Sequence, residues 1–214
     1  MAPFALITRS ALIVHGNAAA TASNILRSEL QFRLAFAADL IALAAYVGVT
    51  AILYVLLKPV NKSLSLVAAF FGLAGCAVSA INLVNTFAPL FVLGGEHYLT
   101  VFRTDQLQAL AMVSLGLYGF GANIGMMFFG FYCFLLGCLI VGSTFLPRII
   151  GVLLVITGLC YLTYTFAYFL SPPLANYLSP YILMPGLFGE GSLMLWLIVV
   201  GVNATKWKAQ AGAT

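Results

Sequence analysis

Residues 115–141 read LGLYGFGANIGMMFFGFYCFLLGCLIV and contain no charged side chain. A helix crosses a hydrocarbon core of about 30 Å with about 20 mostly apolar residues, because each residue adds about 1.5 Å. This segment is long enough and apolar enough for that purpose. It therefore predicts a membrane-spanning helix.

Four other segments satisfy the same criterion, namely residues 34–57, 64–87, 149–170 and 182–202. Of the 214 residues, 63% are hydrophobic and 7% are charged, whereas an ordinary soluble domain carries about a quarter charged residues. The composition excludes a water-soluble surface. The sequence thus predicts an all-α fold, a polytopic transmembrane helix bundle with five spans.

Breaker residues set the expected ends of these helices. Pro59 and Pro89 are expected to close the first and second spans, Pro147 to open the fourth, and residues 171–173 (Ser-Pro-Pro) to end it. Residues 105–112 are expected to continue directly into the third span.

Lysine and arginine residues in short loops predict the orientation, because such loops stay cytoplasmic. Lys58 and Lys62 follow the first span, Arg148 follows the third, and Lys206 with Lys208 follows the fifth. These three places share one side of the membrane. We expect the C-terminus to be cytoplasmic.

The chain divides into three predicted parts. Residues 33–204 form the transmembrane helix bundle and residues 205–214 a cytoplasmic tail. Residues 1–32 are interpreted as the N-terminal stub of a possible missing span, followed by an interfacial helix at about 18–31. The positive-inside rule opposes export of a basic N-terminal tail with no signal ahead of it. We therefore expect a natural protein with six spans and both termini inside.

Polar side chains inside lipid are costly, so their positions indicate where a site could lie. They fall about 24 to 37 Å above the cytoplasmic charges at about 1.5 Å per residue, which places them in the outer half of the membrane. Glu190, between Gly189 and Gly191, is the expected charged centre of a ligand-binding site that opens outward. The other predicted members of this site are Asp39, Asn82, Asn85, Asn123, Tyr164 and Tyr168.

Other interpretations of these residues stay open. The asparagines and Glu190 could form a hydrogen-bond network that only fixes helix packing. Asp39 lies 6 residues from Arg33, so its carboxylate is expected to reach water past the end of the helix. For Glu190, proton coupling and a purely hydrogen-bonding carboxyl group are both compatible with the sequence.

The sequence lacks the motifs of several classes of function. No nucleophile motif, zinc-protease motif, Cys-x-x-Cys pair or phosphate loop is present, so we lean against an enzyme. We expect no metal, since His15 and His97 are the only histidines, and no cofactor. A nucleic-acid partner is not supported, because the basic residues form no cluster. The expected partners are membrane lipids, with a possible helix–helix partner through Gly121 and Gly125.

Several segments carry a family resemblance: AATASNI (19–25), YVLLKPVNKSL (54–64), YGF (118–120), IGMMFFGFYC (124–133), FLPRIIGVLL (145–154), Gly189-Glu190 and LWL (195–197). Together they resemble a bacterial family of integral membrane proteins catalogued as domain of unknown function 4386. The resemblance implies a bacterial cytoplasmic (inner) membrane protein, commonly with six spans, and no activity. The family's first span looks missing here.

Three hypotheses for the function follow. The first is an outward-facing protein that binds or transports a small or lipid-like molecule through Glu190. The second is a membrane-embedded enzyme that modifies a lipid, with Glu190 or Asp39 as acid or base. The third is a structural or assembly subunit of a membrane complex. The first is favoured, because the enzyme lacks a nucleophile–base pair.

Overall fold

The computed structural model describes residues 3–212, which are helical nearly throughout and contain no strand. Five long apolar segments are of a length to cross a membrane: α3 (Glu29–Leu57), α4 (Lys62–Leu93), α5 (Thr104–Gly142), α6 (Arg148–Leu170) and Tyr181–Val199. The last segment combines η2 (Tyr181–Leu183) with α8 (Met184–Val199). The prediction of an all-α fold with five spans is confirmed, and so is the continuation of residues 105–112 into the third span.

Shorter helices occupy the connections and the ends. They are α1 (Pro3–Leu12), α2 (Ala18–Arg27), η1 (His97–Val101), α7 (Pro172–Leu178) and α9 (Ala204–Gly212). The sequence predicted α2 approximately, but neither α7 nor α9. Pro172 does end the fourth span, and it then opens α7, because proline fits the first turn of a helix, where no backbone N–H donor is needed.

The second span is longer than expected. α4 does not end near Pro89 but runs through it to Leu93. Proline removes one backbone hydrogen bond, to the carbonyl of Asn85, and it usually kinks or ends a helix in water. Pro89 is fully buried, and a buried proline is tolerated in a membrane helix because its neighbours compensate for the lost bond.

The outer faces of the long helices are apolar. Ile41 and Ile52 on α3 are 72% and 67% exposed, and Ile81 on α4 is 74% exposed. A water-soluble protein rarely exposes apolar surface on this scale. These faces are suited to contact with lipid tails.

The described residues form two compact units, and α3, α4 and α5 each contribute to both. Unit 1 consists of residues 3–46 and Cys76–Ala122, and unit 2 consists of Val47–Gly75 and residues 123–212. The core of unit 1 includes Leu12, Ile25, Phe32 and Leu90, with Phe87 and Leu115 packed against them. Its α1 and α2 lie in contact with each other.

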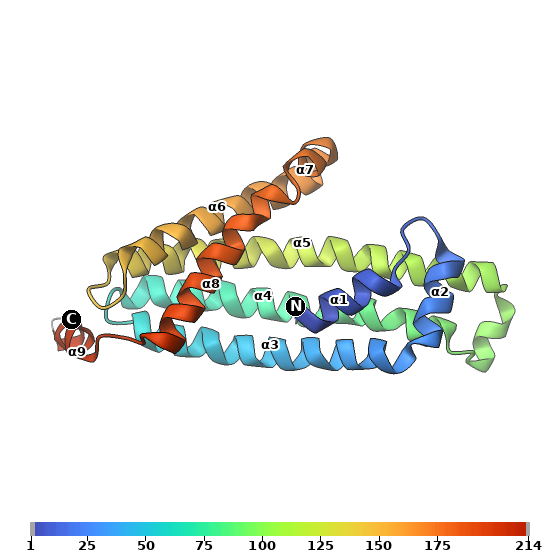
Figure 1. Cartoon of the computed structure of the whole chain (residues 1–214), viewed down its shortest axis with the longest axis horizontal. Coiled ribbons are helices and arrows are strands. Elements are labelled where there is room, and N and C mark those ends of the chain that lie inside the picture. The colour runs from blue at the N-terminus through green and yellow to red at the C-terminus, as the bar shows by residue number, and fades with distance from the viewer. Residues whose placement is uncertain (1–2, 213–214) are drawn as a thin grey trace. The chain divides into compact units, whose positions relative to one another are not determined.

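Unit 2 is built on close approach between helices. A Cβ atom at Gly137 would lie 2.6 Å from the carbonyl oxygen of Gly151, and one at Gly158 would lie 2.6 Å from the carbonyl oxygen of Gly130. The glycines of α5 and of α6 are each spaced by seven residues, so two crossing points hold these antiparallel helices together. α6 and α8 lie side by side, joined through α7 and η2 (Figure 1).

Candidate functional site

Glycines bring α8 against α6 near Glu190. A Cβ atom at Gly189 would overlap the hydroxyl of Thr157, and one at Gly186 would overlap the hydroxyl of Tyr161. The Thr157 hydroxyl donates a hydrogen bond of 2.8 Å to the carbonyl of Pro185. Only glycine permits this separation, as expected for tightly packed membrane helices.

Glu190 is half-buried and receives two uncharged donors. The hydroxyl of Tyr161 on α6 donates a hydrogen bond of 2.8 Å to its Oε1 atom. The thiol of Cys133 on α5 lies 3.9 Å from the same oxygen and donates to it. Three helices, α5, α6 and α8, therefore converge on one carboxyl oxygen.

The second carboxyl oxygen of Glu190, Oε2, receives no hydrogen bond from the described residues. Within residues 3–212, Oε2 accepts no hydrogen bond, and no lysine or arginine side chain forms an ion pair with the carboxyl group. The next residue, Gly191, faces open space, since a Cβ atom there would meet no atom within 4 Å. Glu190 thus keeps one acceptor oxygen available beside an uncrowded stretch of α8.

A second polar atom of α8 also has no partner. The indole nitrogen of Trp196 is buried and finds no hydrogen-bond acceptor among the described residues. An unsatisfied buried donor costs about 1 to 3 kcal/mol. α8 therefore carries both an acceptor and a donor that the described part of the protein leaves unused.

Three of the predicted site residues belong to unit 1, where they join one polar network. Asn85 donates a hydrogen bond of 3.1 Å from Nδ2 to Oδ1 of Asn82. Asn82 donates one of 2.9 Å to the backbone carbonyl of Tyr118. The guanidinium group of Arg9 lies over the ring of Tyr118, 5.5 Å from its centre. Arg9 in turn forms an ion pair of 2.5 Å with Asp39.

The environment of Asp39 differs from the expectation. Its carboxylate does not reach water past the helix end with the help of Arg33. It is buried, with 3% of its side chain exposed, and pairs with Arg9, whose side chain is 8% exposed. Arg33 instead pairs with Glu29 at 2.7 Å on the surface of α3. The physical reason is that α1 packs on unit 1 and brings a cation to Asp39.

The other predicted residues lie in unit 2 with Glu190. The side chain of Asn123 is buried, and its backbone carbonyl accepts a hydrogen bond of 3.4 Å from the hydroxyl of Thr165. The rings of Tyr164 and Tyr168 contact each other with centres 6.3 Å apart. The structure places no hydrogen bond between Tyr164 and Glu190.

Sequence reasoning missed four residues that contact the predicted ones. Arg9 belongs to the basic N-terminal tail that was considered only for membrane topology, and Tyr118 appeared only within a segment of the family resemblance. Tyr161 precedes Tyr164 and Tyr168 by three and seven residues. Helical spacing places the three tyrosines on one face of the helix, and this signal could have identified Tyr161. Cys133 lies within a run of Met and Phe residues that predicts ordinary packing, and nothing in the sequence distinguishes it.

The two glycines expected to dock a partner helix are engaged within the chain. A Cβ atom at Gly121 would overlap the side chain amide of Asn82, and Gly125 is buried. The partner through this pair stays a prediction. As for metals, residues 3–212 contain no group of three or more His, Cys, Asp or Glu side chains able to hold one.

Comparison with known proteins places the chain in a family. A family described as "Domain of unknown function (DUF4386)" matches residues 1–201. An "Uncharacterized protein" of Archaeoglobus fulgidus is 28% identical over 158 residues, which cover 72% of this chain and 76% of that protein. No solved structure matches the chain. Because the match covers nearly the whole length, the chain belongs to the family described as a domain of unknown function, DUF4386.

Proposed function

We propose that this protein binds a small or lipid-like molecule within the membrane, with the carboxyl group of Glu190 as the polar centre of the site. The observation that carries the proposal is the unequal use of the two carboxyl oxygens. Oε1 accepts from Tyr161 and Cys133, whereas Oε2 accepts from no described residue. A carboxyl group in a membrane helix is costly, and it is a functional candidate by default.

Three of the other four Asp and Glu side chains are paired, and the fourth, Glu96, lies outside the long apolar segments. Glu29, Asp39 and Asp105 each form an ion pair with an arginine. Glu190 is the carboxyl group within a long apolar segment that has no cation beside it in residues 3–212. In a hydrocarbon environment an acceptor oxygen without a hydrogen-bond partner is costly. A ligand that donates a hydrogen bond or carries a positive charge would supply the partner that Oε2 lacks among these residues.

The faces around Glu190 favour a lipid-like ligand. Leu187, Phe188, Met194 and Leu195 on α8 are 71%, 62%, 57% and 58% exposed. A molecule that reaches Glu190 along these faces crosses apolar surface first. The ligand therefore has an apolar body and one polar group. Transport of this ligand, with a site open to the outer side, is the wider form of the proposal.

Among the alternatives, a lipid-modifying enzyme has less support. One of its two candidate acid–base groups, Asp39, is held in an ion pair with Arg9, which occupies its carboxylate. The roles of Asp39, Asn82 and Asn85 in ligand binding stay predictions, as do those of Asn123, Tyr164 and Tyr168. An assembly subunit remains the third alternative.

The proposed orientation has the C-terminus on the cytoplasmic side of a bacterial cytoplasmic membrane. The loop residues Lys58, Lys62 and Arg148 share that side under the positive-inside rule. Single cysteines at Lys208 and Glu96, both exposed, can be labelled in intact cells with a membrane-impermeant maleimide, in a background free of native cysteines. Labelling of Glu96→Cys alone is expected, and labelling of Lys208→Cys alone would reverse the orientation.

The binding proposal is tested by ligand-dependent stabilisation. Purified protein in detergent is heated with fractions of a total membrane extract, and the fraction that raises the unfolding midpoint is identified. Glu190→Gln keeps the size of the side chain, removes its acidity and replaces one acceptor oxygen by an amide group that donates hydrogen bonds. The stabilisation is expected to be lost in Glu190→Gln and kept in Glu96→Gln. Equal stabilisation of all three proteins would assign Glu190 to packing.

A further inference from the structure

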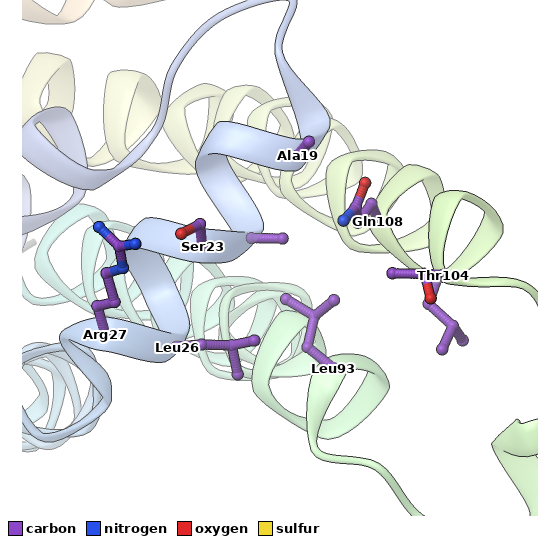
Figure 2. A pocket seen from close by; sticks show the side chains of 9 residues that line it. Ala19, Ser23, Leu26, Arg27, Leu93, Thr104 and Gln108 are labelled. Carbon is purple, nitrogen blue, oxygen red and sulfur yellow. The ribbon is translucent and has the colours of Figure 1, made fainter.

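Unit 1 contains an open cleft of about 560 Å³ that is separate from the Glu190 contacts. It lies between α2, the last residue of α4 (Leu93) and the first turns of α5, and Figure 2 shows its lining side chains. Its volume falls within the range of about 300 to 1,000 Å³ that is typical of small-molecule sites. The lining is mainly apolar, formed by Ala19, Ala22, Leu26, Leu93 and Leu107, with Ser23, Arg27, Thr104 and Gln108 as polar members.

The cation of this cleft has no counter-charge. Of the five arginines in the chain, Arg9, Arg33 and Arg103 pair with carboxylates. Arg27 is exposed and forms neither an ion pair nor a hydrogen bond through its side chain in residues 3–212. In the close view its guanidinium group lies at one end of the lining, at the end of α2 (Figure 2). The cleft thus offers a positive charge beside an apolar wall.

The position of the cleft along the helices is informative. The 32 residues of α4 extend about 48 Å at about 1.5 Å per residue, more than the hydrocarbon core of about 30 Å. The ends of α4 and α5 therefore reach the level of the lipid headgroups. Leu93 and Thr104 are such ends. At this level an acyl chain lies on one side of the cleft and a charged headgroup on the other.

We infer that this cleft binds one anionic phospholipid, with its phosphate group on Arg27 and the upper part of an acyl chain against Leu26, Leu93 and Leu107. Arginine is well suited to phosphate because its planar guanidinium group donates two parallel hydrogen bonds. The hydroxyls of Ser23 and Thr104 and the amide of Gln108 provide further donors for headgroup oxygens. This inference does not rest on the proposed role of Glu190.

The first test varies the charge. Native mass spectrometry of the detergent-solubilised protein, titrated with phosphatidylglycerol or with phosphatidylcholine of the same acyl chains, measures an apparent Kd for each lipid. The wild type is expected to prefer phosphatidylglycerol, and Arg27→Gln to bind it about tenfold more weakly. Arg148→Gln is the matched control, because Arg148 is also exposed and forms no ion pair within residues 3–212, but it does not line the cleft.

The second test reduces the free volume of the cleft. Ala19 lines the cleft and is exposed, so Ala19→Trp fills the cleft without disturbing the core. Ala109→Trp places the same bulk on an exposed position of α5 outside the lining. Loss of phosphatidylglycerol binding in Ala19→Trp alone is the expected result, and it also covers the case in which Arg27→Gln is poorly produced.

Three results would overturn the assignment. The first is equal binding of both lipids by the wild type. The second is unchanged phosphatidylglycerol binding in both single variants, Arg27→Gln and Ala19→Trp. The third is displacement of the lipid by millimolar inorganic phosphate alone. The last result would identify a site for free phosphate instead of lipid. Stabilisation through Glu190 is measured separately, so failure of either proposal leaves the other standing.

Discussion

The guanidinium group of Arg9 lies 2.5 Å from the carboxylate of Asp39, and this ion pair attaches α1 to α3 within unit 1. Both side chains are buried. Two charges in a low-dielectric interior attract strongly, but each has lost its hydration. The pair therefore contributes little net stability, while the loss of one partner leaves an uncompensated charge.

The Arg9–Asp39 pair predicts a non-additive response to substitution. Asp39→Leu is expected to cost about 3 to 5 kcal/mol of stability, because Arg9 is left buried without its partner. The double variant Arg9→Met with Asp39→Leu is expected to recover most of this loss. Thermal unfolding in detergent, followed by circular dichroism, measures both.

A matched control is available on the surface. Glu29 and Arg33 form an ion pair whose side chains are 47% and 51% exposed. Glu29→Gln is expected to change stability by about 0.5 kcal/mol or less. The account of the buried pair fails if the double variant is as unstable as Asp39→Leu alone.

The crossing of α5 and α6 predicts strong sensitivity at Gly137. A Cβ atom there would lie 2.6 Å from the backbone of both Gly151 and Val155. Gly137→Val forces the two helices apart, and overpacking of this kind costs about 1 to 3 kcal/mol or more. Gly116→Ala is the control, because nothing lies within 4 Å of its Cβ position and alanine favours a helix over glycine.

The measurement for the glycine variants is the fraction of monodisperse protein after heating, read by size-exclusion chromatography. A lower unfolding temperature for Gly137→Val and an unchanged or higher one for Gly116→Ala are expected. Equal behaviour of the two variants would mean that α5 and α6 are not in backbone contact at this point.

The hydrogen bond from Tyr161 predicts two further effects on ligand binding. Tyr161→Phe removes the donor to Glu190, and Gly186→Ala pushes the Tyr161 hydroxyl away from α8. Each is expected to weaken ligand-dependent stabilisation by about tenfold in apparent affinity, because the Glu190 carboxyl group is then no longer held in one position for the ligand. Tyr181→Phe is the control, as Tyr181 is 75% exposed. Unchanged affinity in both variants would remove Tyr161 from the site.

The C-terminal helix α9 predicts a protease phenotype. The indole nitrogen of Trp207 donates a hydrogen bond of 2.9 Å to the carbonyl of Leu56, within unit 2. Trp207→Phe removes that bond, so α9 is expected to open more often and to be cut faster by trypsin after Lys206 and Lys208. Thr205→Val, at an exposed position, should leave the cleavage rate at the wild-type value. The contact with Leu56 is unimportant if the two variants are cut equally fast.

The spans could be predicted from the sequence because their signal is local. About 20 apolar residues in a row are sufficient for a helix in lipid, whatever lies beside them. The same reasoning placed the end of α4 near Pro89, because the rule for proline describes an isolated helix and omits the buried neighbours of Pro89. α9 escaped prediction since its nine residues are polar and are held by distant partners such as Leu56.

The candidate site was harder to predict from the sequence than the spans were. Glu190 could be selected from the sequence, because a carboxyl group in an apolar run is conspicuous. Its partner Cys133 could not, since it lies 57 residues away along the chain in an apolar run. Tyr161, 29 residues away, was indicated only by its position on the helix face of Tyr164 and Tyr168. The packing of α5, α6 and α8 brings both partners to Glu190. Arg9 was missed for the same reason: its partner Asp39 is 30 residues distant.

The most direct test of the central claim is native mass spectrometry of the wild type and Glu190→Gln, purified in parallel from the same membranes, with Glu96→Gln as the control. We expect a bound molecule of defined mass, which also persists in Arg27→Gln, on the wild type and on Glu96→Gln, and we expect it to be absent from Glu190→Gln. A wild-type protein without any adduct that persists in Arg27→Gln, or such an adduct at the same mass and occupancy on Glu190→Gln, would contradict this expectation.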